Sequence, residues 1–174
     1  MSSQFGLLKA RRFAPFFGTQ FLGAFNDNLF KNALIVLLTF QAASWTAIAP
    51  EVLTNLAAGI FILPFFLFSA TAGQLADKYD KAKLARLVKL LEIVIMGVAW
   101  LGFSTHSLPL LLIALFLLGL HSTVFGPVKY AILPQHLRQN ELVGGNALVE
   151  AGTFIAILIG TLAGGLLAGA ADHP

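Results

Sequence analysis

Residues 17–36, FGTQFLGAFNDNLFKNALIV, read as a membrane-spanning helix whose centre is interrupted by polar side chains. Five polar residues stand there, two of them oppositely charged: Asn26, Asp27, Asn28, Lys31 and Asn32. An Asp or Lys at the centre of a membrane helix costs ~2.5–3.5 kcal/mol, and each Leu, Ile, Phe or Val offsets ~0.3–0.6 kcal/mol. The fourteen such apolar residues from 13 to 40 therefore offset ~4–8 kcal/mol, against ~5–7 kcal/mol for the two charges. This segment must hide its polar centre among other helices or in a wet cavity.

The composition excludes an ordinary soluble domain. Of the 174 residues, 57% are hydrophobic and only 11% are charged, whereas a soluble domain has about 25% charged residues. Lipid must therefore be the main solvent of this chain. The absence of Cys excludes disulfides, thiolate metal sites and cysteine nucleophiles.

The hydropathy pattern predicts an all-α integral membrane protein with five transmembrane helices. Each apolar run is close to the ~20 residues that cross a hydrocarbon core. We expect Pro64 to kink the second helix, and Gly126 with Pro127 to end or bend the fourth. The predicted spans cover residues 13–40, 53–75, 87–103, 108–125 and 143–168.

The cations lie on alternate connections. Ten of the eleven Lys and Arg precede the first span or belong to the second–third and fourth–fifth connections, and Lys31 is the exception. By the positive-inside rule this pattern puts the N-terminus in the cytoplasm. It also explains the net charge of +3 without nucleic acid as a partner. The long, charged first run favours an uncleaved first helix over a signal peptide.

These features predict three parts of the chain: a cytoplasmic N-terminus over residues 1–12, five transmembrane helices over residues 13–170, and the start of an external loop over residues 171–174. A further helix is expected beyond this loop. The sequence therefore reads as part of a longer chain.

Helical spacing gathers the polar residues of the first span on one side. Gln20, Asp27 and Lys31 share a face, and Asn28 and Asn32 form an adjoining stripe. Two explanations fit. Asp27 and Lys31, one turn apart, can neutralise each other and fasten helices together, or this face can line a central cavity as a substrate or ion site.

The connection between the second and third spans reads GQLADKYDKAKL. We expect Gly73 to allow close helix approach, Asp77 to cap or pair at the membrane rim, and the cations to form a breakable latch. Asp80 stands where the corresponding loop pattern of a transporter superfamily has Gly. The cations of this latch are Lys78, Lys81 and Lys83.

The fourth and fifth spans add further candidates. Gly160 and Gly164 form a small-residue stripe for close helix packing. Glu150 is expected to point into the bundle, either as a structural residue or as part of a cytoplasmic gate. Lys129 is either an anchor at the cytoplasmic mouth or a contact for an anionic headgroup. We expect Glu92 to pair with Lys89, and His121 to be a hydrogen-bonded packing residue.

The sequence contains no enzyme signature. A Walker loop, the G-x-S-x-G and H-E-x-x-H motifs and the H-x4-D arrangement of acyltransferases are all missing. The four His residues form no metal-ligand spacing. We therefore predict no catalytic residue, cofactor or metal for this segment.

Four stretches together resemble the bacterial lysophospholipid transporter family of the major facilitator superfamily: FLGAFNDNLFKNAL, GQLADKYDKAK, FGPVKYAILPQHL and LVGGNALVEAGTFIAILIGTLAGG. The resemblance implies twelve spans in two six-helix halves, of which this chain would hold five from the N-terminal half. It also implies a multi-pass protein of the bacterial inner membrane.

The resemblance further implies movement of lysophospholipids, such as lysophosphatidylethanolamine, from the outer to the inner leaflet. It makes Asp27 the carboxylate of the central cavity and Lys129 the headgroup-contacting lysine, with Gln20, Asn28 and Lys31 beside them. The implied partners are membrane lipids, the lysophospholipid, and a cytoplasmic acyltransferase, which is fused to the transporter in some relatives. Two alternatives are a membrane-anchoring module of such a fusion and a major facilitator for small solutes or drugs.

Overall fold

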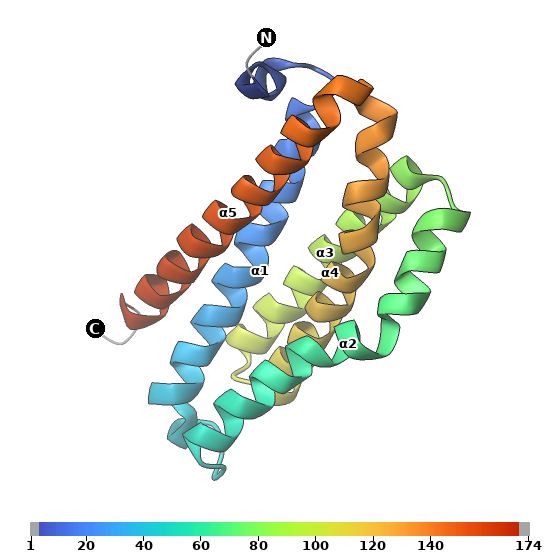
Figure 1. Ribbon diagram of the computed structural model, residues 1–174. Coiled ribbons are helices and arrows are strands. Elements are labelled where there is room, and N and C mark those ends of the chain that lie inside the picture. Colours follow the sequence, from blue (N-terminus) through green and yellow to red (C-terminus); the bar gives the residue numbers. More distant parts are fainter. Residues whose placement is uncertain (1–3, 171–174) are drawn as a thin grey trace. The chain divides into compact units, whose positions relative to one another are not determined.

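The computed structural model of this chain describes residues 4–170, and this part is helical without any strand. Its five long helices are α1 (Ala14–Phe40), α2 (Pro50–Lys78), α3 (Lys81–Ser104), α4 (Leu108–His136) and α5 (Leu142–Ala170) (Figure 1). Three short 3-10 helices accompany them: η1 (Gln4–Lys9), η2 (Ala42–Ser44) and η3 (Gln139–Glu141). The predicted all-α class is confirmed. The predicted external loop at 171–174 lies outside the described residues.

Four helices in the described part are long and apolar enough to cross a membrane: Pro50–Lys78, Lys81–Ser104, Leu108–His136 and Gln139–Ala170. The first helix, α1, is not among them, because polar and charged residues interrupt its centre. The protein is therefore an all-α integral membrane protein. The membrane crossing of α1 stays a prediction.

Two helix ends differ from the prediction. Helix α4 continues through Gly126 and Pro127 to His136 instead of ending near residue 125. Membrane helices tolerate such residues, because neighbouring side chains satisfy the backbone groups that a proline leaves unpaired. Helix α3 begins at Lys81, six residues before the predicted span, because the Asp80 side chain accepts a hydrogen bond from the Lys83 amide at 2.8 Å. Asp80 therefore acts as an N-cap, which explains a carboxylate at this position.

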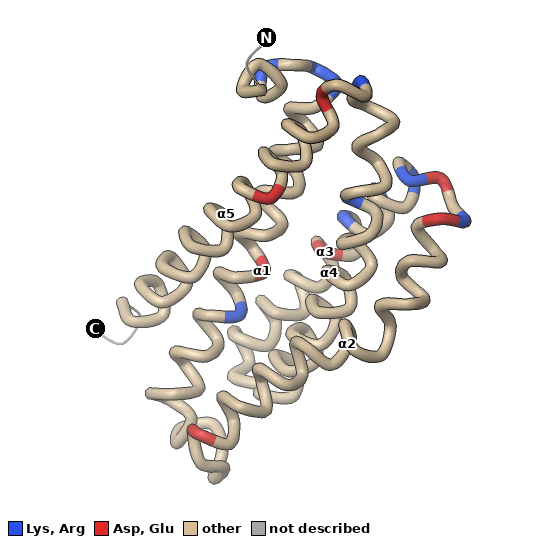
Figure 2. The backbone as a smooth tube through the Cα atoms, in the orientation of Figure 1, with Lys and Arg blue, Asp and Glu red and all other residues tan. Residues whose placement is uncertain are grey.

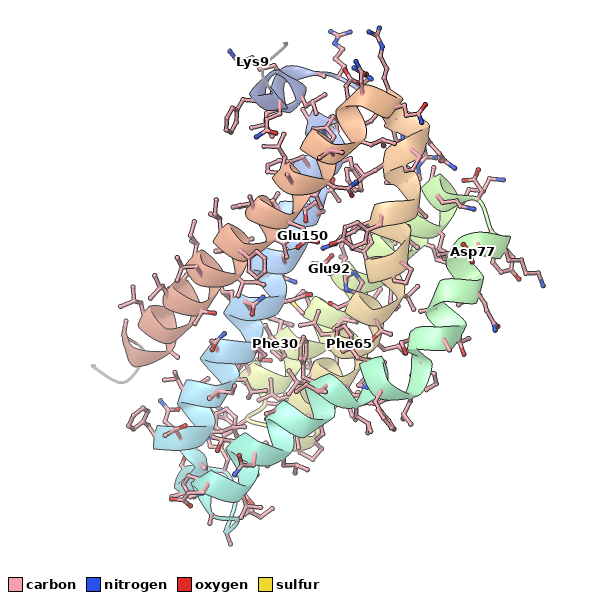
Figure 3. The ribbon with its side chains drawn as sticks, in the orientation of Figure 1. Lys9, Phe30, Phe65, Asp77, Glu92 and Glu150 are labelled. Atoms are coloured by element: carbon pink, nitrogen blue, oxygen red, sulfur yellow. The ribbon has the colours of Figure 1, made fainter. Side chains whose placement is uncertain are left out.

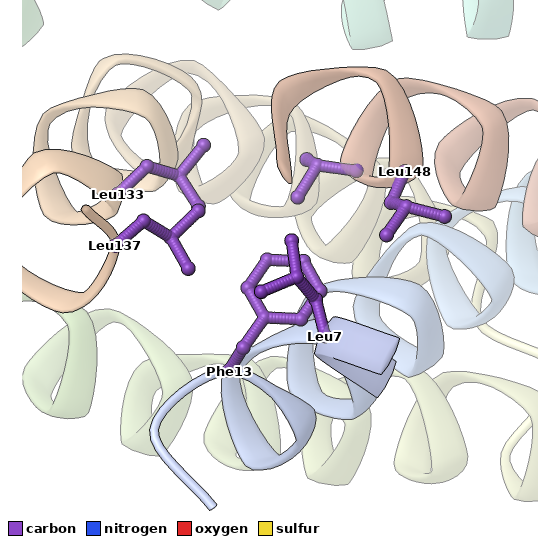
Figure 4. Packing of buried hydrophobic residues seen from close by; sticks show 6 residues of the cluster. Leu7, Phe13, Leu133, Leu137 and Leu148 are labelled. Carbon is purple, nitrogen blue, oxygen red and sulfur yellow. The ribbon is translucent and has the colours of Figure 1, made fainter. Parts of the chain in front are cut away.

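The chain divides into two compact units, formed by residues 1–33 with 129–174 and by residues 34–128. The first unit has its own core beside the start of α1. Phe13 is fully buried there, and the cluster consists of Leu7, Phe13, Leu133, Leu137, Leu148 and Val149 (Figure 4). The segment before α1 thus packs on the end of α4 and the start of α5.

In the same unit, the small residues of α5 lie against α1. The buried face of α5 carries a small residue every fourth position: Gly152, Ala156, Gly160, Gly164 and Ala168. A Cβ atom at Gly160 would lie 2.5 Å from the carbonyl oxygen of Phe25, and one at Gly164 would collide with that of Leu29. The close packing predicted for Gly160 and Gly164 is therefore present.

In the second unit, α2 carries Pro64 within the helix and bends along its length (Figure 1). The bend agrees with the predicted kink. Pro64 is buried, and α4 approaches this part of α2 at Gly119, where a Cβ atom would collide with the carbonyl oxygen of Phe61. A glycine is required at residue 119 by this close approach.

Most charged residues of the second unit lie in or beside the α2–α3 connection (Figure 2). Lys81 donates a hydrogen bond to the carbonyl oxygen of Asp77 at 3.1 Å, whereas the Asp77 side chain is exposed at the end of α2 (Figure 3). The close approach predicted at Gly73 is wrong within the described chain, since a Cβ atom there would meet nothing within 4 Å. Gly73 therefore makes no close helix contact within residues 4–170.

Candidate functional site

The first unit brings residues of α1, α4 and α5 into one polar contact. The Lys129 ammonium donates a hydrogen bond to the Thr153 hydroxyl, with Nζ and Oγ1 3.3 Å apart. Thr153 Oγ1 in turn lies 3.0 Å from Oε1 of Gln20 and 2.8 Å from the carbonyl oxygen of Val149. Lys129 and Gln20, which are 109 residues apart in the sequence, thus share one hydroxyl.

Gln20 is the most deeply buried member of this contact. It is 2% exposed, and its Nε2 atom has no hydrogen-bond partner among the described residues. Because Gly152 has no side chain, the amide can lie directly against α5. A buried amide N–H without a partner is costly, so this group is suited to donate to a bound acceptor.

Two turns further along α1, the charged residues form a second polar group. Asp27 and Asn28 are buried, with exposures of 9% and 8%. Lys31 is half-buried, donates to Oδ1 of Asn28 at 2.9 Å, and is attracted by the Asp27 carboxylate. The predicted polar face of α1 is therefore inside the unit, and the structure supports both explanations of the pair.

The adjoining stripe of α1 also contacts α5. The Asn32 side chain donates to the hydroxyl of Thr161 at 3.1 Å and to the carbonyl oxygen of Asn28 at 2.8 Å. Asn28 donates to the carbonyl oxygen of Ala24 at 2.8 Å. These amides fasten α1 to α5 and hold Asn28 in position for Lys31.

The structure places Lys129 within α4, which continues past the predicted span of residues 108–125. The Lys129 ammonium is half-buried and is attracted by the carboxylate of Glu150. Glu150 lies on α5 (Figure 3). Its Nζ atom also lies 5.0 Å from the centroid of the Tyr130 ring. A lysine that bonds to Thr153 and faces a carboxylate differs from an ordinary solvated anchor.

Two residues of this site, Thr153 and Thr161, were not predicted from the sequence. They lie eight residues apart on α5, each directly after a buried glycine, Gly152 and Gly160. A polar residue beside a small-residue stripe was the available signal, because the stripe marks the face that contacts another helix.

Arg12 and Glu141 form an ion pair beyond the start of α1. The guanidinium donates two hydrogen bonds to the carboxylate, at 2.8 and 2.7 Å, and a third to the carbonyl oxygen of His136 at 3.1 Å. The hydrogen bonds with Glu141 raise the pKa of Arg12. This bidentate pair holds the segment before α1 on the α4–α5 connection.

The second unit contains another polar cluster, in which Glu92 bonds to Lys89 with 2.7 Å between Oε2 and Nζ. The predicted local pair is confirmed. His121 is 2% exposed and stacks on Phe125, with ring centroids 6.2 Å apart. The hydrogen bond predicted for His121 is not found among the described residues.

The site of the first unit offers complementary chemistry. Lys129, Thr153 and Gln20 provide an ammonium, a hydroxyl and an amide N–H, which are donors for an anion such as a phosphate. Asp27 provides a carboxylate for an ammonium. The described residues contain no cluster of His, Asp and Glu suited to a metal ion.

Comparison with known proteins identifies the family of this chain. Residues 16–172 match the profile of the Major Facilitator Superfamily. Similar curated proteins include the lysophospholipid transporter LplT of Escherichia coli (strain SE11), of Escherichia coli (strain K12 / DH10B) and of Shigella boydii serotype 18 (strain CDC 3083-94 / BS512). Each is 32% identical over 149 residues, which cover 86% of this chain and 34% of the relative. The chain thus spans about a third of the length of these relatives. No solved structure matches it.

Proposed function

This chain belongs to the major facilitator superfamily, and on that premise we propose that it is part of a transporter that moves lysophospholipids from the outer to the inner leaflet of a bacterial inner membrane. The similar curated proteins are named as lysophospholipid transporters. The observation that carries the proposal is the contact of the half-buried Lys129 and Thr153 with the buried Gln20. It offers several donors for a phosphate within a membrane-spanning part of the chain.

The phosphate end of the substrate would bind to these three residues. Lys129 supplies the charge, and the unpartnered Nε2 of Gln20 supplies a directed donor. Because this amide is buried, a bound phosphate oxygen would remove the cost of its missing hydrogen bond. The Thr153 hydroxyl, now close to two carbonyl oxygens, can rotate between the protein and the ligand.

The amine of a lysophosphatidylethanolamine headgroup would bind to Asp27. Lys31 is attracted by the Asp27 carboxylate but donates its hydrogen bond to Asn28. A substrate ammonium could therefore replace Lys31 as the cation nearest to Asp27. Both ends of a zwitterionic headgroup would thus find an opposite charge along α1. Its acyl chain requires only an apolar flank, which membrane helices provide.

The transport cycle would be alternating access of two six-helix halves around this site. The N-terminus would lie in the cytoplasm, as the cation pattern predicts. The Arg12–Glu141 pair would then sit on the cytoplasmic side, and Glu150, near Lys129, would belong to the gate on that side. A cytoplasmic acyltransferase would use the delivered lysophospholipid. This segment would have no catalytic role.

Transport by the full-length protein in proteoliposomes tests this proposal. Asp27→Asn keeps the size of the side chain and removes its charge, so uptake of labelled lysophosphatidylethanolamine should fall at least about tenfold, the effect of losing ~1.4 kcal/mol of interaction. The matched control is Glu51→Gln, at an exposed carboxylate in the first turn of α2, which should transport normally.

Two results would contradict the proposal. Normal uptake by a well-expressed Asp27→Asn variant would remove Asp27 from the site. No uptake of any lysophospholipid by the wild-type protein would reject the substrate, and transport of a small solute instead would favour a different major facilitator.

A further inference from the structure

Three ionisable side chains of the second unit meet near the middle of α3 and α4. Oε2 of Glu92 lies 2.7 Å from Nζ of Lys89 and 3.4 Å from Nε2 of His121. The three side chains are 19%, 12% and 1% exposed, for Lys89, Glu92 and His121. Ionisable groups inside membrane-spanning helices are costly, and they usually mark a function.

The ion pair alone does not explain this cluster. Lys89 and Glu92, one turn apart on α3, already neutralise each other. His121 adds a third titratable group, and its Nδ1 atom is buried without a hydrogen-bond partner among the described residues. A Leu or Phe at this position would fill the space without an unsatisfied polar atom. The imidazole therefore requires a reason beyond packing.

The ring of Phe125 organises the cluster. His121 stacks on it nearly in parallel, at an interplanar angle of 8°, and Nζ of Lys89 lies 4.3 Å from its centroid. The Lys89 ammonium thus has two favourable neighbours, the Glu92 carboxylate and the face of an aromatic ring. The contact of Lys89 with the Phe125 ring can persist when its bond to Glu92 is weakened.

The charges around His121 favour a proton over a metal ion as the ligand. Lys89 and Glu92 are the charged groups that act on it. Residues 34–40 of α1 and 108–128 of α4 bring no further charge, and the charged residues of α2 stand in its first and last turns. Because the Lys89 ammonium binds the same Glu92 oxygen, a metal cation would be repelled. A proton needs only the imidazole lone pair.

We propose that Lys89, Glu92 and His121 form a proton-binding site whose occupancy is linked to the transport cycle. With a neutral imidazole, the cluster has no net charge. When the imidazole lone pair binds a proton from water, an imidazolium lies beside Glu92 and the cluster carries a net charge of +1. This charge is more favourable where water reaches the cluster, so protonation stabilises conformations that open it. The proton returns to water when the cluster closes.

The site itself can be tested without any substrate. We expect the imidazole signal of His121, in NMR spectra of the full-length protein with isotope-labelled histidine, to titrate as the pH is lowered. His121→Gln should remove this signal and so assign it. Glu92→Gln should shift its midpoint, because the neighbouring carboxylate favours the imidazolium. A signal that does not change at any pH at which the protein stays folded would overturn the proposal.

The link to transport rests on the proposed function and needs a second measurement. Lysophosphatidylethanolamine uptake by proteoliposomes should change with pH, by up to about tenfold per pH unit for one titrating group. His121→Gln should flatten this profile, and His136→Gln, at an exposed imidazole in the last turn of α4, should keep it.

The outcomes separate the two proposals. An identical pH profile in wild type and His121→Gln would overturn the link. If the wild-type protein moves no lysophospholipid, the proposed substrate fails, and the NMR titration still decides the proton site. If His121→Gln does not fold, Glu92→Gln must alter both the titration and the profile, or the proposal is wrong.

Discussion

Helices α1 and α2 have nearly the same length, 27 and 29 residues, but of the two only α1 buries polar side chains. Helix α1 buries Gln20, Asp27 and Asn28. Helix α2 exposes large apolar side chains, and Phe66 is 85% exposed. In water this would be an inverted protein, but in lipid an exposed phenylalanine costs nothing and an exposed carboxylate costs much.

The comparison shows which residues identify the face of a membrane helix that contacts other helices. Lipid tails are as apolar as leucine, so hydrophobicity does not select the face of a helix that contacts protein. Small residues and polar residues select it. Helix α1 lies against the glycines of α5 with its amides bonded across the contact, whereas α2 places Gly73 against nothing in the described chain.

The largest effect is expected where α5 touches the backbone of α1. Gly164→Leu would force a side chain into the carbonyl of Leu29, and it should lower the free energy of unfolding by ~3 kcal/mol, at the upper end for overpacked sites. The neighbouring Gly165 meets nothing within 4 Å, so Gly165→Leu should leave stability unchanged or slightly higher. Thermal unfolding of the full-length protein in detergent measures both. Equal losses would mean that the close α1–α5 contact does not form.

A smaller effect is expected from the polar contact beside it. Thr153→Val keeps the shape of the side chain but removes the hydroxyl that Gln20 and Lys129 share, and it should cost ~1–3 kcal/mol because buried polar atoms lose a partner. On α2, Thr54→Val removes only a hydroxyl that donates to the carbonyl of Glu51 one turn earlier. Its cost should stay within ~0.5 kcal/mol. Similar losses of unfolding free energy for the two variants would mean that the polar contact of α1 is no more important for stability than the Thr54 hydroxyl of α2.

The smallest effect is expected outside the membrane-spanning helices. Arg12→Gln removes the bidentate bond to Glu141, and its apparent melting temperature should fall by about 1–2 °C at low salt and by less at high salt, as for other exposed ion pairs. Arg11→Gln, at the neighbouring exposed residue, is the control and should match the wild type. A salt-independent loss would assign Arg12 a packing role.

Several features were predictable because they are local. The helical class, the five long helices and the Lys89–Glu92 pair follow from periodicity and spacing along one chain segment. The burial of Asp27 followed from the energy of a charge in lipid. The Asp80 cap is local too, but in the sequence Asp80 was noted only as a departure from the Gly of the loop pattern.

The sequence by itself determined which side chains had to be buried, because the cost of a charge or an amide in lipid is a property of the residue. Only the tertiary structure decided which of them meet. Lys129 reaches Gln20 through Thr153, and His121 reaches Glu92, because helix packing sets distances between residues that periodicity leaves free. Helix α4 likewise continues through Pro127, which a membrane helix tolerates where neighbouring groups satisfy the freed backbone.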